Sequence, residues 1–167
     1  MKRVTAIRLA LGCIALVGCA PVPEAGEAFR DLAAPITSVA LFEPAKFAGH
    51  WETIASYDAD SCALDVVATT SEMIDLAERK CAGGVAHSIA QITGPGRLTP
   101  KGGAHKGQEY WVMWVDQTYR TAVIGTVTGE FGMILNRTAD IPSDRLQAAR
   151  EILDWNGYDL TRLITRP

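Results

Sequence analysis

The chain has 167 residues, of which 48% are hydrophobic and 21% are charged, and its formal net charge is −3. This length suits a single domain that can bury a sizeable core. The acidic balance offers no electrostatic basis for binding nucleic acid, so we exclude nucleic-acid-binding proteins as a class.

The N-terminus has the pattern of an export signal. Three basic residues precede an uncharged apolar run over residues 9–17, which is far shorter than the ~20 residues that span a bilayer. Small residues then lead into Cys19, and this arrangement resembles the lipobox of bacterial lipoproteins, in which the signal is cut before a cysteine that carries the lipid. We therefore expect a signal peptide over residues 1–18 and a lipid such as palmitate on Cys19. The alternative is an ordinary cleaved signal with an accidental cysteine.

Residues 19–35 are predicted to form a flexible tether, because the stretch after Cys19 is rich in Pro, Ala and Glu. The globular domain is then expected over residues 36–167. Ala20 stands where an aspartate is associated with inner-membrane retention in some bacteria. We therefore expect an outer-membrane protein that faces the periplasm. Its lipid would hold it there, since the acidic domain lacks a basic patch for anionic membranes.

Two cysteines, Cys62 and Cys81, remain in the domain. An exported chain meets an oxidising compartment, where an even pair of cysteines most simply forms a disulfide. A redox or metal site is the alternative, but the pair lacks C-x-x-C spacing and no histidine lies between the two. We predict a structural disulfide, which would stabilise the domain by roughly 3 kcal/mol on the chain-entropy account.

Short apolar and β-branched runs between turn residues predict antiparallel strands through most of the domain. Residues 110–138 hold three such runs, separated by compact polar turns, and predict a meander. Because its side chains are apolar on both faces, the sheet needs cover on both sides, which indicates a closed barrel or a sandwich. The candidates before the meander are strands at 47–57, 64–70, 72–76 and 85–93, a stub at 97–99 and a loop at 101–107.

Near the C-terminus, apolar residues recur every three or four positions, which marks one face of a helix. Ser143 is a plausible N-cap, and Asn156-Gly157 is a usual stop. Residues 158–165 can then return as a strand. From the residues alone we predict an all-β fold of seven or eight antiparallel strands, one late helix packed outside, and a final strand.

Three groups of residues, in this order, resemble the signatures of the lipocalin family. The first is a glycine two residues before a tryptophan, the second an Asp and a Tyr in a turn between two late strands, and the third a single arginine. In this sequence the groups are Gly49 and Trp51, then Asp116, Tyr119 and Arg120, and finally Arg137. The tail at residues 157–159 and the lipobox look most like the bacterial outer-membrane lipoprotein branch. The resemblance covers about residues 44–164.

The resemblance implies an eight-stranded antiparallel up-and-down barrel with one C-terminal α-helix packed outside, wide enough to hold one small ligand. It also implies that Trp51 closes one end of the barrel, with the Arg137 guanidinium over its ring, so the signature residues are structural. The sequence departs from the pattern at Glu52, which replaces a tyrosine often found after the signature tryptophan. The span from Cys81 to Tyr110 is also short, so the fifth strand is expected to be short.

Alternation along the strands groups the side chains by face, and the resemblance to lipocalins implies which face lines the interior. The predicted lining is aromatic and aliphatic with a few hydroxyls, which suits an apolar or amphipathic guest such as a fatty acid or lysophospholipid. The alternative is that the same side chains fill a small, dry core. The predicted inward residues are Thr53, Ala55, Tyr57, Tyr110, Val112, Trp114, Phe131, Met133 and Leu135, with Trp111 and Met113 facing outward.

A catalytic or metal site needs convergent groups, and the sequence offers no clear set. The three histidines, His50, His87 and His105, are scattered, and none has the spacing of a metal-binding pair. We therefore expect no enzyme, cofactor or metal. The leading hypothesis is a membrane-anchored lipocalin that binds or carries a small hydrophobic molecule. The alternatives are a scaffold or interaction lipoprotein with a filled barrel and, third, a lipid-modifying enzyme.

Overall fold

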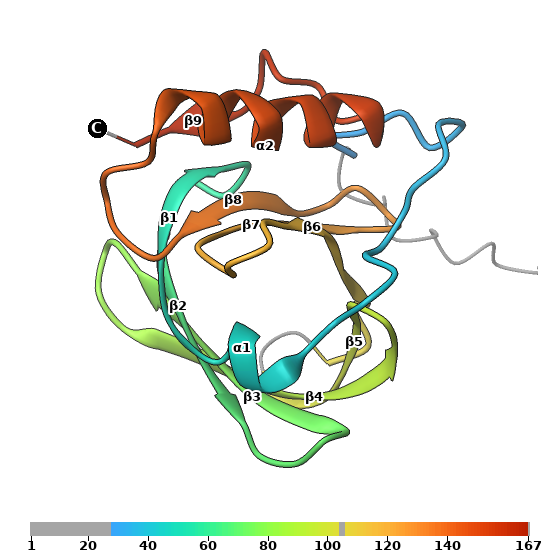
Figure 1. The fold of residues 1–167 in the computed structure, drawn as a ribbon, viewed down its shortest axis with the longest axis vertical. Helices are drawn as coiled ribbons and strands as arrows, with labels where there is room; N and C mark the ends of the chain where they lie inside the picture. The colour runs from blue at the N-terminus through green and yellow to red at the C-terminus, as the bar shows by residue number, and fades with distance from the viewer. Residues whose placement is uncertain (1–27, 104–105, 167) are drawn as a thin grey trace, which may run out of the picture.

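The computed structural model describes residues 28–103 and 106–166. Eight antiparallel strands close a barrel in this part of the chain: each pairs with the next, and β1 pairs with both β2 and β8. Figure 1 shows the ring that they form, with helix α2 across its outside. The predicted all-β up-and-down barrel with one outer helix is confirmed. The strands are β1 (Gly49–Ser56), β2 (Ser61–Ala68), β3 (Met73–Lys80), β4 (Val85–Gly94), β5 (Arg97–Gly103), β6 (Tyr110–Val115), β7 (Thr121–Thr126) and β8 (Gly132–Asn136).

Helix α2 (Ser143–Trp155) packs against the outer face of β6 and β7. Ala149 and Leu153 on its inner side are fully buried. The chain then returns to the barrel as β9 (Ile164–Thr165), which pairs with the end of β1. The predicted final strand is therefore present but is much shorter than residues 158–165. In the described ranges, no helix has the length and apolar character needed to cross a membrane.

The two ends of α2 differ in how well the sequence predicts them. Asn156 is the C-cap and Gly157 follows with a φ of +83°, so the predicted stop is confirmed. The predicted N-cap is wrong, because Pro142 holds that position and Ser143 is already helical, with no side-chain capping bond. The Pro142 carbonyl accepts the first helical hydrogen bond, from the Leu146 amide at 3.0 Å.

The apolar side chains form two cores on opposite sides of the barrel wall. The inner core lies within the barrel, and the outer core lies between the wall and α2. Members of the inner core include Trp51, Leu64, Leu76, Leu98, Tyr110, Val112, Ile124, Met133 and Leu135. Members of the outer core include Ile54, Ala55, Tyr57, Met113, Val123, Ile134, Leu153 and Tyr158.

The family signatures meet at one end of the barrel, which we call the closed end. Trp51 is 0% exposed there, and its indole N–H donates to the carbonyl of Phe47 in the short helix α1 (Pro44–Phe47) at 2.8 Å. The Arg137 guanidinium lies over the indole, 3.6 Å from the ring centroid, and donates to the His50 carbonyl. Gly49 has a φ of +107°, and a Cβ there would lie 3.1 Å from Arg137 Nη1. The glycine is thus required by both its backbone conformation and the arginine beside it.

The second signature forms the turn between β6 and β7. The Asp116 carboxylate accepts hydrogen bonds from the backbone amides of Arg120 and Thr121, which fixes the turn. Tyr119 adopts a φ of +55°, and its hydroxyl accepts a hydrogen bond from the Glu43 amide at 2.9 Å. Its carbonyl in turn accepts from Arg137 Nε at 3.0 Å. These contacts give the signature residues structural roles at the closed end.

The domain begins earlier than the predicted boundary at residue 36. Arg30 is only 6% exposed, and its guanidinium donates to the carbonyls of Asn156 and Val127, each at 3.0 Å. Phe29 stacks on Tyr57, with ring centroids 4.8 Å apart. The predicted tether is therefore wrong over residues 28–35, because these side chains attach the segment to the outer core. Residues 1–27, with the predicted signal peptide and Cys19, lie outside the described residues.

Strand β5 is longer than the predicted stub and includes residues expected in a loop. It pairs with β4 along its length, but with β6 only through Arg97–Trp111 and Leu98–Tyr110. Pro100 limits the ladder, since it has no amide hydrogen to donate. Beside this short seam, the Val39 amide donates to the Val112 carbonyl at 2.9 Å. The N-terminal segment thus covers part of the edge that β5 leaves unpaired.

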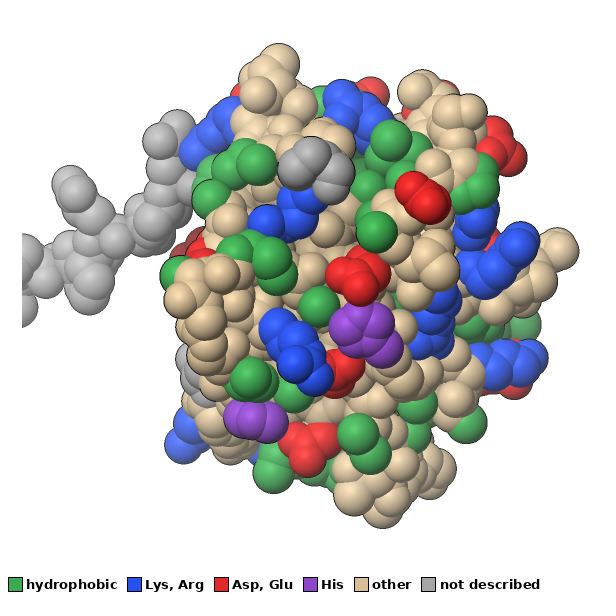
Figure 2. Space-filling view, turned by 90° about the vertical axis from the view of Figure 1, so that its left-hand side faces the viewer, with side chains coloured by type: hydrophobic (Ala, Val, Ile, Leu, Met, Phe, Trp, Pro, Cys, Tyr) green, Lys and Arg blue, Asp and Glu red, His purple; other side chains and the backbone are tan. Residues whose placement is uncertain are grey.

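The outer faces of β1, β2 and β3 carry a mixture of acidic, basic and histidine side chains (Figure 2). His50 Nδ1 lies 2.7 Å from an Asp65 oxygen, and His50 Nε2 lies 3.1 Å from a Glu52 oxygen. Arg79 Nε contacts the other Asp65 oxygen at 2.6 Å. This wall of the barrel therefore presents a solvated, ion-paired surface.

Candidate ligand cavity

A β-bulge in β1 changes which side chains reach the interior. Thr53 pairs with Leu135, whereas Ala55 pairs with Ile134, so Ile54 is an extra residue on β1. Thr53 therefore shares the inward face of Leu135, but Ala55 faces outward with Ile134. Tyr57 is also in the outer core, where its hydroxyl donates to the Asp159 carbonyl at 3.0 Å. The predicted inward placement of Ala55 and Tyr57 is wrong for this reason.

A second bulge has the same effect in β6. Val112 pairs with Ile124 in the inner core, but Trp114 pairs with Val123, so Met113 is the extra residue. Met113 belongs to the outer core and Trp114 packs against it. Trp111 and Met113 face outward as predicted, whereas the inward placement of Trp114 is wrong.

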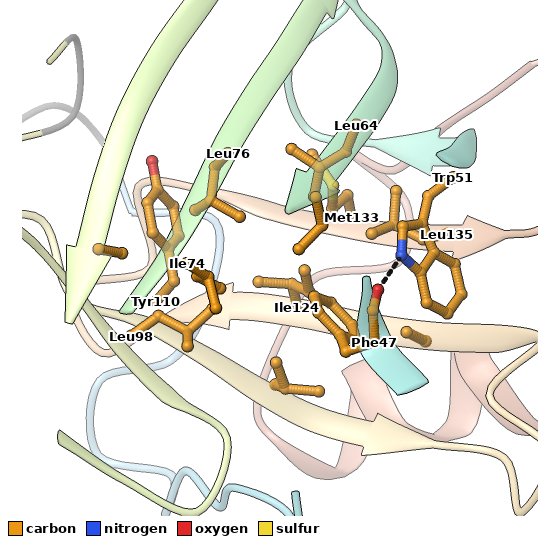
Figure 3. Close-up of a cluster of buried hydrophobic side chains, with 14 of the residues drawn as sticks. Phe47, Trp51, Leu64, Ile74, Leu76, Leu98, Tyr110, Ile124, Met133 and Leu135 are labelled. Atoms are coloured by element: carbon orange, nitrogen blue, oxygen red, sulfur yellow. Dashed lines mark hydrogen bonds between the residues drawn. The ribbon is translucent and has the colours of Figure 1, made fainter. Parts of the chain in front are cut away.

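The interior holds a small cavity at the end opposite Trp51, which we call the open end. Its volume is about 30 Å³, measured as the space open to the centres of water-sized molecules. Tyr110, Phe131 and Met133 line it, while Val112 and Leu135 lie deeper in the inner core. Figure 3 shows Tyr110 and Trp51 at opposite ends of the cluster, with Leu76, Ile124 and Met133 between them. The remaining lining residues are Leu64, Leu76, Glu78, Ala86, Ser88, Leu98 and Ile124.

Those seven residues were not among the predicted inward-facing side chains. Six of them come from β2 to β5, where only strands and not facing directions were assigned. A two-residue alternation is nevertheless readable in β3, where Ile74, Leu76 and Glu78 are buried and the residues between them are not. This alternation could therefore have predicted that Leu76 and Glu78 face the interior.

Two aromatic rings meet at the open end. Tyr110 and Phe131 contact each other edge to face, with centroids 5.4 Å apart. The Tyr110 hydroxyl donates to the Gln108 side chain at 3.0 Å. Burial, together with the nearby Glu78 carboxylate, raises the pKa of Tyr110, so the phenol stays protonated at neutral pH. Phe131 is only partly buried, and it therefore lies at the boundary between the cavity and solvent.

Charged groups gather just above the apolar part of the cavity. Glu78 is 4% exposed, and one of its oxygens lies 2.9 Å from the Lys80 ammonium. The same ammonium lies 2.8 Å from an Asp58 oxygen. Burial opposes the charge on Lys80, but the hydrogen bonds to Asp58 and Glu78 outweigh it and raise the pKa of the ammonium. A charged lysine thus bridges two acidic side chains at the open end.

A disulfide lies beside this charged group. Cys62 and Cys81 are bonded, with an S–S distance of 2.00 Å, which confirms the predicted pair. The disulfide joins the start of β2 to the residue that follows β3, and the Cys81 amide donates to the Asp60 carbonyl in the β1–β2 loop at 2.8 Å. Arg166 Nη1 lies 2.8 Å from the Cys81 sulfur. Within residues 28–103 and 106–166, His, Cys, Asp and Glu side chains form no group of three that could hold a metal ion.

Comparison with known families identifies the barrel. The family described as the lipocalin-like domain matches residues 42–167, which include all eight barrel strands and the outer helix. The chain belongs to this family. Lipocalins are generally binding or carrier proteins rather than enzymes.

Individual relatives of this lipocalin are distant. Temperature-induced lipocalin-1 of Arabidopsis thaliana is 32% identical over 59 residues, which are 35% of this chain and 32% of that protein. The chain thus matches about a third of the length of this curated relative. Among solved structures, lobster apocrustacyanin A1 superposes with a TM-score of 0.58 at 12% identity, covering 72% of this chain and 77% of that one. The siderocalin Ex-FABP superposes with a TM-score of 0.57 at 13% identity, covering 73% and 94%. At 12–13% identity, the likeness to these two solved structures shows the fold alone.

Proposed function

We propose that this lipocalin binds a small, slender hydrophobic molecule through the open end of its barrel. The observation that carries the proposal is the cavity between the aromatic pair and the inner core, lined mainly by Leu64, Leu76, Leu98, Ile124 and Met133. Single-chain lipids, such as fatty acids and lysophospholipids, have a matching shape and polarity.

Binding requires the cavity to enlarge. Ligand pockets usually measure roughly 300–1,000 Å³, and this cavity measures about 30 Å³. Met133 is suited to move, because its unbranched side chain adopts many shapes at little cost. Phe131 is partly exposed and can turn toward solvent, with the loss of its edge-to-face contact with Tyr110. These two side chains would make room for an alkyl chain above the Trp51 plug.

The small cavity also favours one alternative. If Met133 and Phe131 stay in place, the barrel is a filled core and the protein is a scaffold or interaction module. The two functions differ in one measurable property, which is the uptake of a small amphiphile by the purified domain.

Calorimetric titration of the domain with 1-octanol tests the proposal. Ala86 lines the cavity and pairs with Glu78, whereas Ala77 pairs with His87 on the outer face of the same two strands. We expect saturable binding by the wild type and by Ala77→Trp, and its loss in Ala86→Trp, because only the latter fills the cavity. The absence of saturable heat in the wild type would favour the filled scaffold.

We also propose that a lipid on Cys19 anchors the protein to the outer membrane, facing the periplasm, as in the bacterial lipoprotein branch. The support is the lipobox-like sequence before Cys19 and the alanine after it. Labelling of expressing bacteria with radioactive palmitate tests this directly. We expect label in the wild type and none in Cys19→Ala, which would fractionate away from the outer membrane. Equal labelling of both proteins would contradict the anchor.

A further inference from the structure

Three polar side chains from three strands converge on the cavity at its open end. Glu78 comes from β3, Ser88 from β4 and Tyr110 from β6, and all three are at least nine-tenths buried. The other residues that line the cavity are apolar. A guest in the cavity would therefore place its polar end among Glu78, Ser88 and Tyr110 and its apolar end toward Met133.

The charge at this position is negative on balance. The Lys80 ammonium is shared between Glu78 at 2.9 Å and Asp58 at 2.8 Å, so two carboxylates face one cation. A ligand carboxylate would bring a third negative charge to a buried place where repulsion is strong. Lys80 offers it little compensation, because both of its short contacts are already made to protein carboxylates. A neutral or cationic head group meets no such penalty.

Ser88 provides an independent sign that the cavity suits a ligand with a polar group. It is 2% exposed, and its hydroxyl has no hydrogen-bond partner among the described residues. A buried hydroxyl without a partner loses its contacts with water and gains nothing in return. Because Ser88 lines the cavity, a head group beside it would restore a hydrogen bond that the folded chain does not supply.

We propose that the cavity selects single-chain amphiphiles whose head group donates hydrogen bonds and carries no negative charge, namely alcohols, glycerol esters or amines rather than fatty acids. Glu78 accepts a hydrogen bond from the head group, and Ser88 supplies the second contact. This inference rests on the proposed binding function and narrows its ligand class, which for the apolar lining alone includes fatty acids.

Calorimetric titration at pH 7.5 with three eight-carbon ligands separates the head groups from the chain. We expect octylamine and 1-octanol to bind at least about tenfold more tightly than octanoate, a ratio that corresponds to about 1.4 kcal/mol. If none of the three binds, the proposed binding function fails and the inference falls with it. If octanoate binds as tightly as the other two, binding stands and only the head-group inference is overturned.

Two substitutions assign the preference to named residues. Glu78→Gln should tighten octanoate and weaken octylamine, so that their ratio changes by about tenfold or more. Asp75→Asn is the matched control, since Asp75 lies on the same strand, is flanked by the inward residues Ile74 and Leu76, and pairs with outward residues. We expect it to leave the ratio unchanged, and an equal change in both variants would overturn the role of Glu78.

Ser88→Ala is a second variant that tests the head-group preference, and it serves if Glu78→Gln does not fold. The hydroxyl accounts for one hydrogen bond, so 1-octanol and octylamine should bind several-fold more weakly to Ser88→Ala while octanoate changes little. Unchanged affinity for all three ligands would show that Ser88 does not contact the head group. That result would contradict the proposed position of the ligand.

Discussion

The Arg137 guanidinium lies 3.6 Å from the centre of the Trp51 ring and donates hydrogen bonds to four carbonyls near it, those of Lys46, Phe47, His50 and Tyr119. The cation thus joins β8 to the start of β1, to α1 and to the β6–β7 turn. Burial lowers the pKa of Arg137, which still stays charged in the physiological range. Trp51 is therefore held between the inner core and a fixed cation.

Replacement of Trp51 by alanine should lower the free energy of unfolding by ~3–5 kcal/mol, as expected for truncation of a fully buried aromatic side chain. Trp155→Ala is the matched control, because Trp155 is 76% exposed. Its cost should stay within about 0.5 kcal/mol. Urea unfolding of both variants measures the difference, and a loss below about 1 kcal/mol for Trp51→Ala would mean that Trp51 does not close the barrel.

Tyr158 connects the C-terminal segment to the β7–β8 hairpin. Its hydroxyl donates to the Phe131 carbonyl at 2.8 Å and accepts from the Thr126 amide at 2.9 Å. Tyr158→Phe keeps the ring and removes both contacts, so we expect a loss of about 1–2 kcal/mol in the free energy of unfolding. Chemical denaturation of the wild type and the variant measures this loss, and we expect the m-value to be the same in both. No measurable loss would show that the ring alone holds the segment.

The disulfide should contribute to stability through the unfolded state. Cys62 and Cys81 are separated by 19 positions, and closing a loop of this size is worth roughly 3 kcal/mol on the chain-entropy account. Reduction with dithiothreitol should lower the melting temperature, and the double change Cys62→Ala and Cys81→Ala should lower it by about the same amount. If the reduced and oxidised proteins melt together, the bond is not a structural one.

His50 gives the domain a small dependence on pH. Hydrogen bonds to Asp65 and then to Glu52 raise the pKa of His50 above its ordinary value of 6.5. A raised folded-state pKa means that the stabilisation is complete below 6.5 and is lost as the pH rises through the folded-state value. NMR titration of the imidazole should show the raised pKa in the wild type and a lower one in Asp65→Asn. A pKa at or below 6.5 in the wild type would contradict the ion pairs.

The sequence was sufficient for the fold and the closed end. The strand pattern and the three signatures predicted an eight-stranded barrel with the Arg137 cation over Trp51, and the structure places them so. The closed end could be predicted because the signature residues contact one another through backbone carbonyls and a single guanidinium. These contacts depend little on the surrounding side chains.

The cavity was less predictable because alternation fails at a bulge. The extra residues Ile54 and Met113 belong to ordinary apolar strands, with no glycine or proline to mark the change of phase. The inward placements predicted beyond these extra residues, at Ala55, Tyr57 and Trp114, were therefore reversed. The N-terminal boundary was missed for another reason. Two of the carbonyls that bind the Arg30 guanidinium, those of Asn156 and Val127, lie far away in sequence, and the composition of residues 28–35 gives no sign of such partners.

Methyl-detected NMR of the domain titrated with 1-octanol shows whether a ligand enters the barrel. We expect saturable shifts at the cavity-lining methyl groups of Leu76, Leu98 and Met133, and none at the exposed Leu41 and Val67. Shifts at the outer-core residues Ile54 and Leu153 instead, or no saturable shift at any methyl group, would contradict ligand binding inside the barrel.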